Sequence, residues 1–384
     1  MLGLLLARQG VAVTVLEKHA DFLRDFRGDT IHPSTLQLMH ELGLLDRLLK
    51  LPHQKAKRLR GQIGETTFTM ADFTHLPVAC PAIVLMPQWD FLSFLAEEAR
   101  RYPSFHLEMN ARAETLVERD GRIVGLLASL PDGAVEYRAA LVVAADGRHS
   151  DVRREAGLKV IESGAPMDVL WFRLSRKASD PDDTMGRFDP GRVFVMIDRG
   201  DYWQCAYVIA KGNDTKVRAA GLEAFQQSVA HAMPFAADRV GEIADWDQVK
   251  LLTVAVDHLE RWCKPGLLCI GDSAHAMSPI GGVGINLAVQ DAVATANMLG
   301  TKLRRNEVSL ADLQAVQRRR AWPARMTQRL QVAVQNRIIS RTLASMAPIK
   351  PPRIVRLFDR FPILRRIPAR LIGMGFRPEH VSPR

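Results

Sequence analysis

The chain has 384 residues, of which 47% are hydrophobic and 24% charged, a composition typical of globular proteins with a large core. The net charge is +10, but no nucleic-acid-binding motif accompanies it, and aromatic residues make up only 7%. We therefore expect no nucleic-acid partner, and we assign the charge to a solvated surface that also attracts an anionic cofactor.

The cysteines are too scattered to form a framework. Cys80, Cys205, Cys263 and Cys269 make no C-x-x-C pair, and no histidines stand at zinc-finger spacing. The sequence therefore predicts neither a metal site nor disulfides, and scattered thiols indicate a reducing, cytoplasmic setting.

The first hundred residues alternate helices and strands. Residues 1–9 have a helical pattern that ends at Gly10, and the β-branched strand 11–18 follows. Apolar residues at helical spacing predict two further helices, at residues 33–42 and 88–101.

The middle of the chain has the pattern of an antiparallel sheet. Asp120-Gly121 is a two-residue hairpin signal between two strand-like runs. Further strands are expected at residues 167–177, 192–199 and 202–210, before a helix at 222–239.

The last third returns to the first pattern. A strand at residues 267–272 is followed directly by a helix at 284–300. Ser309 and Asp312 form a capping-box signature, which opens a helical stretch that runs to about residue 346 and that Pro323 interrupts. Alternating strands and helices at both ends of an antiparallel middle indicate a parallel α/β domain with an inserted sheet domain.

Glu17 lies near the end of the strand 11–18. In a dinucleotide-binding unit, an acid at the end of the second strand bonds ribose hydroxyls. The first half of such a unit, a strand with G-x-G-x-x-G, would precede Met1 and does not occur in residues 1–384. We therefore expect residues 1–384 to hold such a cofactor weakly, and a solvated strand end stays the alternative for Glu17.

Two later strings follow buried-looking strands. In residues 141–153, LVVAADGRHSDVR, a strand ends in Asp146-Gly147, with Ser150 and Arg153 after it. In residues 266–299, a strand places Asp272 at its carboxyl end, where α/β sheets bind ligands.

A glycine-rich segment follows Asp272. Gly281, Gly282 and Gly284 let the backbone approach a flat ligand closely. Asn286 enters a helix whose N-terminus offers free N–H groups that stabilise negative charge developing on a ring.

These strings, D-G-x-x-S-x-x-R and GD–SAH–P–GG-x-G-x-N–DA, resemble those of the class A flavoprotein monooxygenases, such as p-hydroxybenzoate hydroxylase and the ubiquinone-pathway hydroxylases. The resemblance covers roughly residues 1–345. It implies an α/β fold: a Rossmann-like FAD-binding parallel-sheet domain, an inserted antiparallel β-sheet substrate domain and a helical C-terminus. It also implies that NAD(P)H and O2 are used to hydroxylate an aromatic, phenolic or quinone-like small molecule.

The resemblance implies an FAD-binding role for each matching residue. Glu17 would bind the adenosine ribose, Arg27 the diphosphate region and Gln88 the ribityl chain. Asp146 would support FAD and NAD(P)H, and Asp272 would bond the ribityl hydroxyls. Pro279 would lie near the reactive edge of the flavin, and the pyrimidine end would face the backbone N–H groups of Gly282, Val283, Gly284, Ile285 and Asn286.

Other candidates receive structural roles or none. We assign no residue as a catalytic acid or base. His275 is expected to be a structural loop histidine, and Tyr202 and Trp203 are expected to pack in a core rather than to bind substrate.

The resemblance also divides the chain. It gives a discontinuous FAD-binding domain at residues 1–160 and 255–345, a substrate domain at 161–254 and a basic tail at 346–384. Residues 350–384 carry nine Lys or Arg and two acids, interleaved with Ile, Leu and Phe. This tail either packs on the body or makes a weak peripheral contact with an acidic membrane surface.

Two departures from the family pattern leave alternatives open. The glycine loop is absent from residues 1–384, and the family's phenol-binding tyrosines have no clear counterpart. An FAD-dependent reductase or dehydrogenase of the same superfamily is one alternative. A truncated pseudoenzyme that does not retain FAD is the other.

Overall fold

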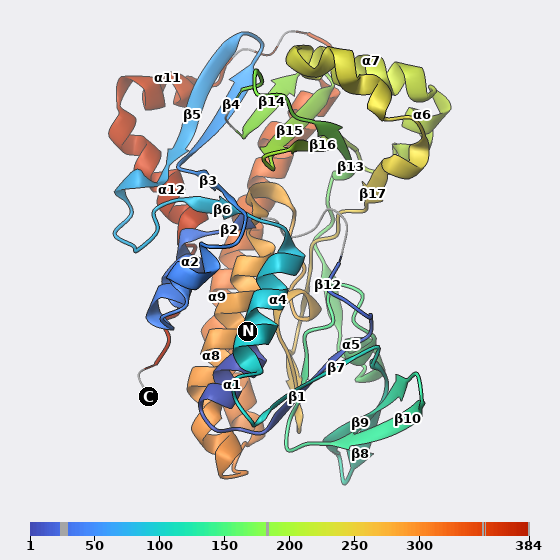
Figure 1. Ribbon diagram of the computed structural model, residues 1–384, viewed down its shortest axis with the longest axis vertical. Coiled ribbons are helices and arrows are strands. Elements are labelled where there is room, and N and C mark those ends of the chain that lie inside the picture. The colour runs from blue at the N-terminus through green and yellow to red at the C-terminus, as the bar shows by residue number, and fades with distance from the viewer. Residues whose placement is uncertain (24–29, 182–183, 348, 350, 383–384) are drawn as a thin grey trace.

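The computed structural model describes residues 1–23, 30–181, 184–347, 349 and 351–382, so that Arg27 lies outside the described residues. Two long helices, α8 (Gly284–Arg304) and α9 (Leu310–Val334), pack side by side through the middle of the molecule (Figure 1). Ser309 caps α9 through the predicted capping box with Asp312. Sheets and shorter helices surround this pair.

Parallel strands from distant parts of the chain confirm the predicted α/β class. The strand β1 (Val13–Glu17) pairs in parallel with β7 (Phe105–Met109). The strand β11 (Val142–Ala144) pairs in parallel with β20 (Leu267–Cys269), which also pairs with β19 (Cys263–Lys264). These parallel pairs place the strand ends that carry Glu17, Asp146 and Asp272.

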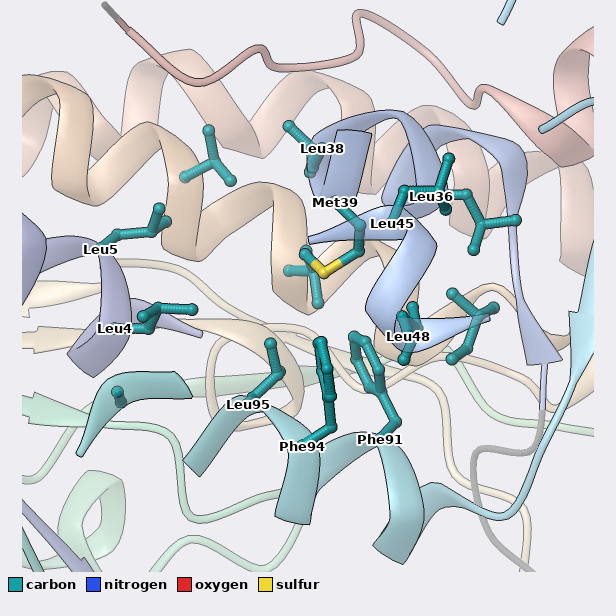
Figure 2. Close-up of a cluster of buried hydrophobic side chains, with 14 of the residues drawn as sticks. Leu4, Leu5, Leu36, Leu38, Met39, Leu45, Leu48, Phe91, Phe94 and Leu95 are labelled. Carbon is teal, nitrogen blue, oxygen red and sulfur yellow. The ribbon is translucent and has the colours of Figure 1, made fainter. Parts of the chain in front are cut away.

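Four helices near the N-terminus share one apolar core (Figure 2). Three of them, at residues 2–8, 33–41 and 88–99, were predicted and bury apolar residues three or four positions apart, which lie on the same side of a helix; the short helix at 45–48 was not predicted. Each fully buried Leu or Phe stabilises this core by roughly 1.5–3 kcal/mol. The helices are α1 (Leu2–Arg8), α2 (Pro33–Glu41), α3 (Leu45–Leu48) and α4 (Gln88–Ala99).

A seven-stranded sheet forms the upper part of Figure 1, in the order β17-β13-β16-β15-β14-β4-β5. All its pairs are antiparallel except β14 with β4. Two of its strands precede residue 161, and the domain boundaries stay a prediction. The strands are β4 (Arg58–Ile63), β5 (Thr66–Asp72), β13 (Met167–Ser175), β14 (Met185–Asp189), β15 (Arg192–Asp198), β16 (Tyr202–Ala210) and β17 (Lys250–Leu252).

Short helices cover one face of this sheet. Two of them occupy the segment for which the sequence predicts a single helix. The single helix predicted at 222–239 is wrong: α7 (Leu222–Ala232) ends early, and a 3-10 helix, η2 (Pro234–Glu242), follows. Pro234 has no N–H to continue the α-helical ladder, so that the chain starts a new turn there. The helix α6 (Asp214–Ala219) precedes them.

The predicted hairpin at Asp120-Gly121 is confirmed. It joins β8 (Arg112–Arg119) to β9 (Arg122–Leu130), and both turn residues have positive φ, of 50° and 73°. The strand β10 (Gly133–Arg138) completes this sheet.

Smaller elements of the fold are β2 (Thr30–Ile31), β3 (Gln54–Ala56), η1 (Phe73–His75), β6 (Ile83–Leu85), α5 (Asp151–Glu155), β12 (Val160–Glu162), η3 (Trp246–Gln248), β18 (Asp257–Leu259), η4 (Gly271–Ser273) and η5 (Ile280–Gly282).

The predicted interruption at Pro323 does not occur. The helix α9 continues through this buried proline to Val334. It then widens into one π-helical turn, η6 (Gln335–Ile339), before α10 (Ser340–Ala344). Proline costs a helix one hydrogen bond, and here the burial of the ring offsets part of that cost.

The basic tail folds on the body, as one of the two expectations states. The helix α11 (Arg353–Arg360), the turn η7 (Pro362–Arg365) and the helix α12 (Arg366–Gly373) pack along β5. In the described part of the chain, no helix is both long and apolar enough to cross a membrane.

Candidate functional site

The candidate site lies where the carboxyl ends of parallel strands meet the start of α8. Asp146 follows β11, and Asp272 follows β20, the strand paired with it. The hydroxyl of Ser273 donates to the carbonyls of Ala144 (2.7 Å) and Ile270 (2.9 Å), and so ties the two strand ends together. Ligands of open α/β sheets bind at such strand ends.

Asp272 lies at the edge of this site with its side chain 32% exposed. The Arg148 guanidinium lies 3.9 Å from its carboxylate, and a Cβ on Gly284 would come within 3.9 Å of Oδ1. The carboxylate therefore stands next to the N-terminus of α8, where the helix dipole favours a negative charge.

Glycine is required in the turn before α8. Gly281 and Gly282 have φ values of 75° and 62°, and a Cβ on Gly282 would lie 2.0 Å from Oγ1 of Thr30. The Thr30 hydroxyl donates to the Gly282 carbonyl at 2.9 Å. A side chain at Gly282 would therefore separate the turn from the strand that holds it.

Asn286 clamps this turn to the segment 30–35. Its Oδ1 accepts from the backbone N–H of His32 and from the Thr35 hydroxyl, both at 2.8 Å. Its Nδ2 donates to the carbonyls of Thr30 (3.0 Å) and Gly282 (3.1 Å). Among the described residues, no side chain caps the start of α8, so that the N–H groups of its first turn are not claimed by a cap from that part of the chain.

A buried ionic cluster lies behind Asp272. Asp291, on α8, accepts from the Gly271 amide (3.0 Å), from His275 Nε2 (2.6 Å) and from Arg320 Nε (2.8 Å). Burial opposes ionisation of Asp291, but the charges and hydrogen bonds of His275 and Arg320 outweigh it and lower its pKa. Asp291 thus fixes the residue that directly precedes Asp272.

Three glutamines hold the loop between Asp272 and the glycine turn. Gln331 accepts from the Ser278 amide (3.2 Å) and donates to the carbonyls of Ser278 (2.9 Å) and Ile280 (2.8 Å). Gln328 donates to the Ala276 carbonyl, and Gln335 donates to the Ser278 hydroxyl. Pro279, between Ser278 and Ile280, is therefore held on both sides.

Comparison with known protein families shows to which family the chain that carries this site belongs. A family described as FAD binding domain matches residues 1–330. The chain belongs to that family.

Named relatives and solved structures agree. The chain is 31% identical over 374 residues to the 6-methylpretetramide 4-monooxygenase of Streptomyces rimosus, covering 96% of this chain and 88% of the relative. It is 24% identical over 313 residues to the 3-demethoxyubiquinol 3-hydroxylase of Escherichia coli, covering 78% of this chain and 76% of the relative. The crystal structure of p-nitrophenol 4-monooxygenase from Pseudomonas putida superposes with a TM-score of 0.75 at 20% identity, over 96% of this chain and 93% of that one.

These matches confirm the resemblance to flavoprotein monooxygenases and the predicted fold. The roles of the individual residues are not tested by them and stay predictions. Glu17 ends β1, where its carboxylate accepts from the His19 amide at 3.0 Å, and Gln88 is the half-buried first residue of α4. Neither placement contradicts the FAD contact expected of these residues.

The D-G-x-x-S-x-x-R string has a clear structural use. Asp146 accepts from the Val152 amide (3.2 Å), and Ser150 caps α5 through the Arg153 amide (2.9 Å). The Arg153 side chain forms a buried ion pair with Asp257 (3.1 Å) and donates to the Ser273 carbonyl (3.3 Å). The string therefore braces the loop that carries Asp272.

His275 and Trp203 are buried, which fits the structural roles expected of them, whereas Tyr202 is only partly buried and lies outside the core of the seven-stranded sheet. His275 is buried and bonded to Asp291. Trp203 lies in the core of the seven-stranded sheet, with its ring N–H donated to Asp180 (2.9 Å). The Arg173 guanidinium covers the ring of Tyr202 at 4.9 Å.

Several partners that shape the site were not predicted from the sequence: Thr30, His32, Thr35, Arg320 and Gln331; Asp291 stands in the quoted DA of the last string, but its role was not predicted. His32 is buried, and its Nδ1 bonds the Ile372 carbonyl at 2.8 Å. Burial lowers the pKa of His32 to about 4. Polar residues on an otherwise apolar helix face, such as Gln328, Gln331 and Gln335, were the one sequence signal for part of this set.

Proposed function

We propose that the protein is an FAD-dependent monooxygenase that hydroxylates an aromatic, phenolic or quinone-like small molecule with NAD(P)H and O2. The observation that carries the proposal is the placement of Asp272 beside the glycine turn and the uncapped start of α8. Family membership and relatives named as monooxygenases support it.

The described residues fit FAD at one end of the cofactor. The glycine turn leaves no side chain between the backbone and a flat ring, and the first N–H groups of α8 are donors without a side-chain cap. Glu17 would hold the adenosine ribose and Asp272 the ribityl chain, with Gln88 beside that chain, and Asp146 would support FAD and NAD(P)H. When bound, FAD supplies the redox chemistry, and the protein supplies position and field.

The start of α8 would act electrostatically. Its N–H groups and dipole stabilise negative charge on the ring that they face, since they point at the place where charge develops. The side chains of Asn286, Gln331 and Asp291 would act as positioning groups, because each holds the loop through hydrogen bonds.

NAD(P)H would bind transiently. The sequence contains no G-x-G-x-x-G that could form a second, dedicated dinucleotide unit. The net charge of +10 would attract the anionic co-substrate to the surface or to the flavin groove. Four buried free thiols in the described chain fit the reducing cytoplasm in which such a co-substrate is available.

An isotope experiment tests the reaction. The protein is incubated with FAD, NAD(P)H, isotopically labelled O2 and a panel of phenols and quinols. One labelled oxygen atom in the organic product supports hydroxylation. Turnover without label, supported equally by a dye acceptor under nitrogen, would establish the reductase or dehydrogenase alternative. A protein that retains no FAD at any concentration would favour the pseudoenzyme.

A substitution tests the site. Asp272→Ala should weaken FAD binding by roughly 1.5–3 kcal/mol, the value of a charge-assisted hydrogen bond. The matched control is Asp132→Ala, which removes an exposed aspartate in the turn between β9 and β10. Equal FAD affinity in both variants, measured by fluorescence titration, would remove Asp272 from the site.

A further inference from the structure

Large apolar side chains are exposed on α11, η7 and α12. Leu357, Phe361, Ile363 and Ile367 are 42%, 51%, 62% and 58% exposed, and they lie within eleven consecutive residues. Isolated exposed apolar residues are ordinary, but a cluster of this density on one short segment marks an interaction surface.

Arginines alternate with these apolar residues. Arg356, Arg360 and Arg366 are exposed and directly precede Leu357, Phe361 and Ile367 in the chain, and Arg370 lies one helical turn beyond Arg366. We call these eight side chains the C-terminal patch. Asp359 is the only acid of the sequence between residues 353 and 370, and it pairs with Arg365 at 2.8 Å.

The α12 part of the C-terminal patch is anchored on the body of the protein. On the inner side of α12, Ala369 is fully buried, and a Cβ on Gly373 would lie 3.0 Å from Leu76 and 3.2 Å from Phe73. The Ile372 carbonyl is bonded to the buried His32. The apolar residues of α12 are thus divided between a packed inner side and an exposed outer side.

We propose that the C-terminal patch docks on the surface of an anionic lipid bilayer. Arginines attract anionic headgroups, and apolar side chains at the same level insert at the boundary between headgroups and acyl chains. The charge of the segment is complementary to that of such a surface. The helices are of eight residues each, so that they lie on the bilayer rather than cross it.

The same features disfavour other occupants. A symmetric dimer through the C-terminal patch would bring one arginine-rich surface against an identical one, with Asp359 as the only acid of each segment to compensate. A nucleic acid would be attracted by the arginines, but it would leave Ile363 and Ile367 without an apolar partner. A bilayer satisfies both kinds of side chain.

Docking would also orient the molecule. The C-terminal patch rests on β5, the edge strand of the seven-stranded sheet, as Figure 1 shows. That edge would face the bilayer, while β8, β9 and β10 lie at the far end of the molecule.

Vesicle flotation tests the proposal without requiring activity. The full chain is mixed with vesicles of phosphatidylcholine alone or of phosphatidylcholine and phosphatidylglycerol in equal parts. We expect flotation with the anionic vesicles only, and less of it at high salt because screening shortens the reach of the arginines. Absence of flotation with anionic vesicles at low salt would overturn the proposal.

Paired variants distinguish docking at the C-terminal patch from nonspecific adsorption to vesicles. Phe361→Ser with Ile363→Ser should abolish flotation, whereas Leu127→Ser with Val135→Ser, at sites 37% and 41% exposed, should not. Arg360→Glu with Arg366→Glu should weaken binding by about 25-fold or more, since each arginine near the surface contributes about fivefold. The control is Arg119→Glu with Arg261→Glu, which changes net charge equally at exposed sites elsewhere.

Two outcomes would contradict the proposal. Equal losses in the C-terminal patch and control variants would show that only net charge or general hydrophobicity matters. Self-association in sedimentation experiments that the Phe361 and Ile363 changes abolish, without flotation, would assign the C-terminal patch to a second copy of the chain.

Discussion

Two buried aspartates in this molecule have nearly the same surroundings. Asp180, beside the seven-stranded sheet, accepts two bonds from Arg239 at 2.8 Å and one from the Trp203 ring at 2.9 Å. Asp291, on α8, accepts from Arg320 and from the ring of His275. The Arg239 guanidinium holds the pKa of Asp180 well below its usual range, and Asp291 is also shifted downward.

The two aspartates differ in the backbone amide that each one holds. Asp180 accepts from Lys177 in a loop at the end of β13, whereas Asp291 accepts from Gly271, next to the proposed FAD ligand Asp272. The same ionic chemistry therefore stabilises the fold in one region and shapes the candidate site in the other. Burial and charge alone do not distinguish a functional cluster from a structural one.

The largest effect is expected from Asp291→Ala. It leaves Arg320 with less compensation and the Gly271 amide without its acceptor, which should cost about 3–5 kcal/mol of unfolding free energy. The affinity for FAD should also fall, by about tenfold or more, because the loop that carries Asp272 loses its anchor. Urea denaturation and FAD fluorescence titration measure the two losses.

The matched change is Asp180→Ala, which removes the main anionic partner of the buried Arg239. Its cost in unfolding free energy should be similar, about 3–5 kcal/mol, since a buried charge again loses its main partner. At temperatures where the variant stays folded, its FAD affinity should remain within about twofold of the original. If both variants lost FAD equally, the difference between the two regions would disappear.

The sequence predicted the parts of the site that are local. A strand shortly before Asp272 and a helix after three glycines are patterns within twenty residues, and both occur, although β20 ends at Cys269 and Asp272 itself lies in the turn η4. The partners of Asn286 are different: Thr30, His32 and Thr35 lie about 250 residues earlier. No local pattern links such residues, because tertiary packing alone brings them together.

The positions at which helices end also depend on tertiary packing and not on local sequence alone. Pro234 ends a predicted helix, but Pro323 does not, although the local rule is the same for both. Pro323 is buried in the body of α9, next to α8, while Pro234 opens the shorter η2. Packing decided which proline was tolerated.

A third prediction extends the comparison to pH. His32 is held neutral by burial, with its pKa lowered from 6.5 to about 4. Between these values the unfolded chain binds a proton that the folded chain does not, so that roughly 3 kcal/mol of stability is lost as the pH falls from 6.5 to 4. His32→Asn should flatten this decline in urea denaturation measured across the range.

His106→Asn, at an exposed position of β7, provides the control for replacing a histidine by asparagine. The pKa of His258 is also lowered, chiefly by burial and then by Arg325, so that part of the decline should persist in the His32 variant. A profile identical to that of the original protein would show that His32 does not titrate as its burial requires.

The smallest effect is expected from Gln331→Leu, and it separates support of the site from support of the fold. Leucine fills a similar volume but leaves the Ser278 amide and the carbonyls of Ser278 and Ile280 without this partner, at a cost of roughly 1–3 kcal/mol. Because these groups flank Pro279, the loop should loosen while the two ionic clusters remain intact. We expect FAD affinity to fall several-fold with only a modest loss of unfolding free energy.

Gln314→Leu, at an exposed position of the same helix, should change neither quantity. Loss of stability in Gln331→Leu without any change in FAD affinity would place Gln331 with Asp180, among residues that stabilise the fold alone.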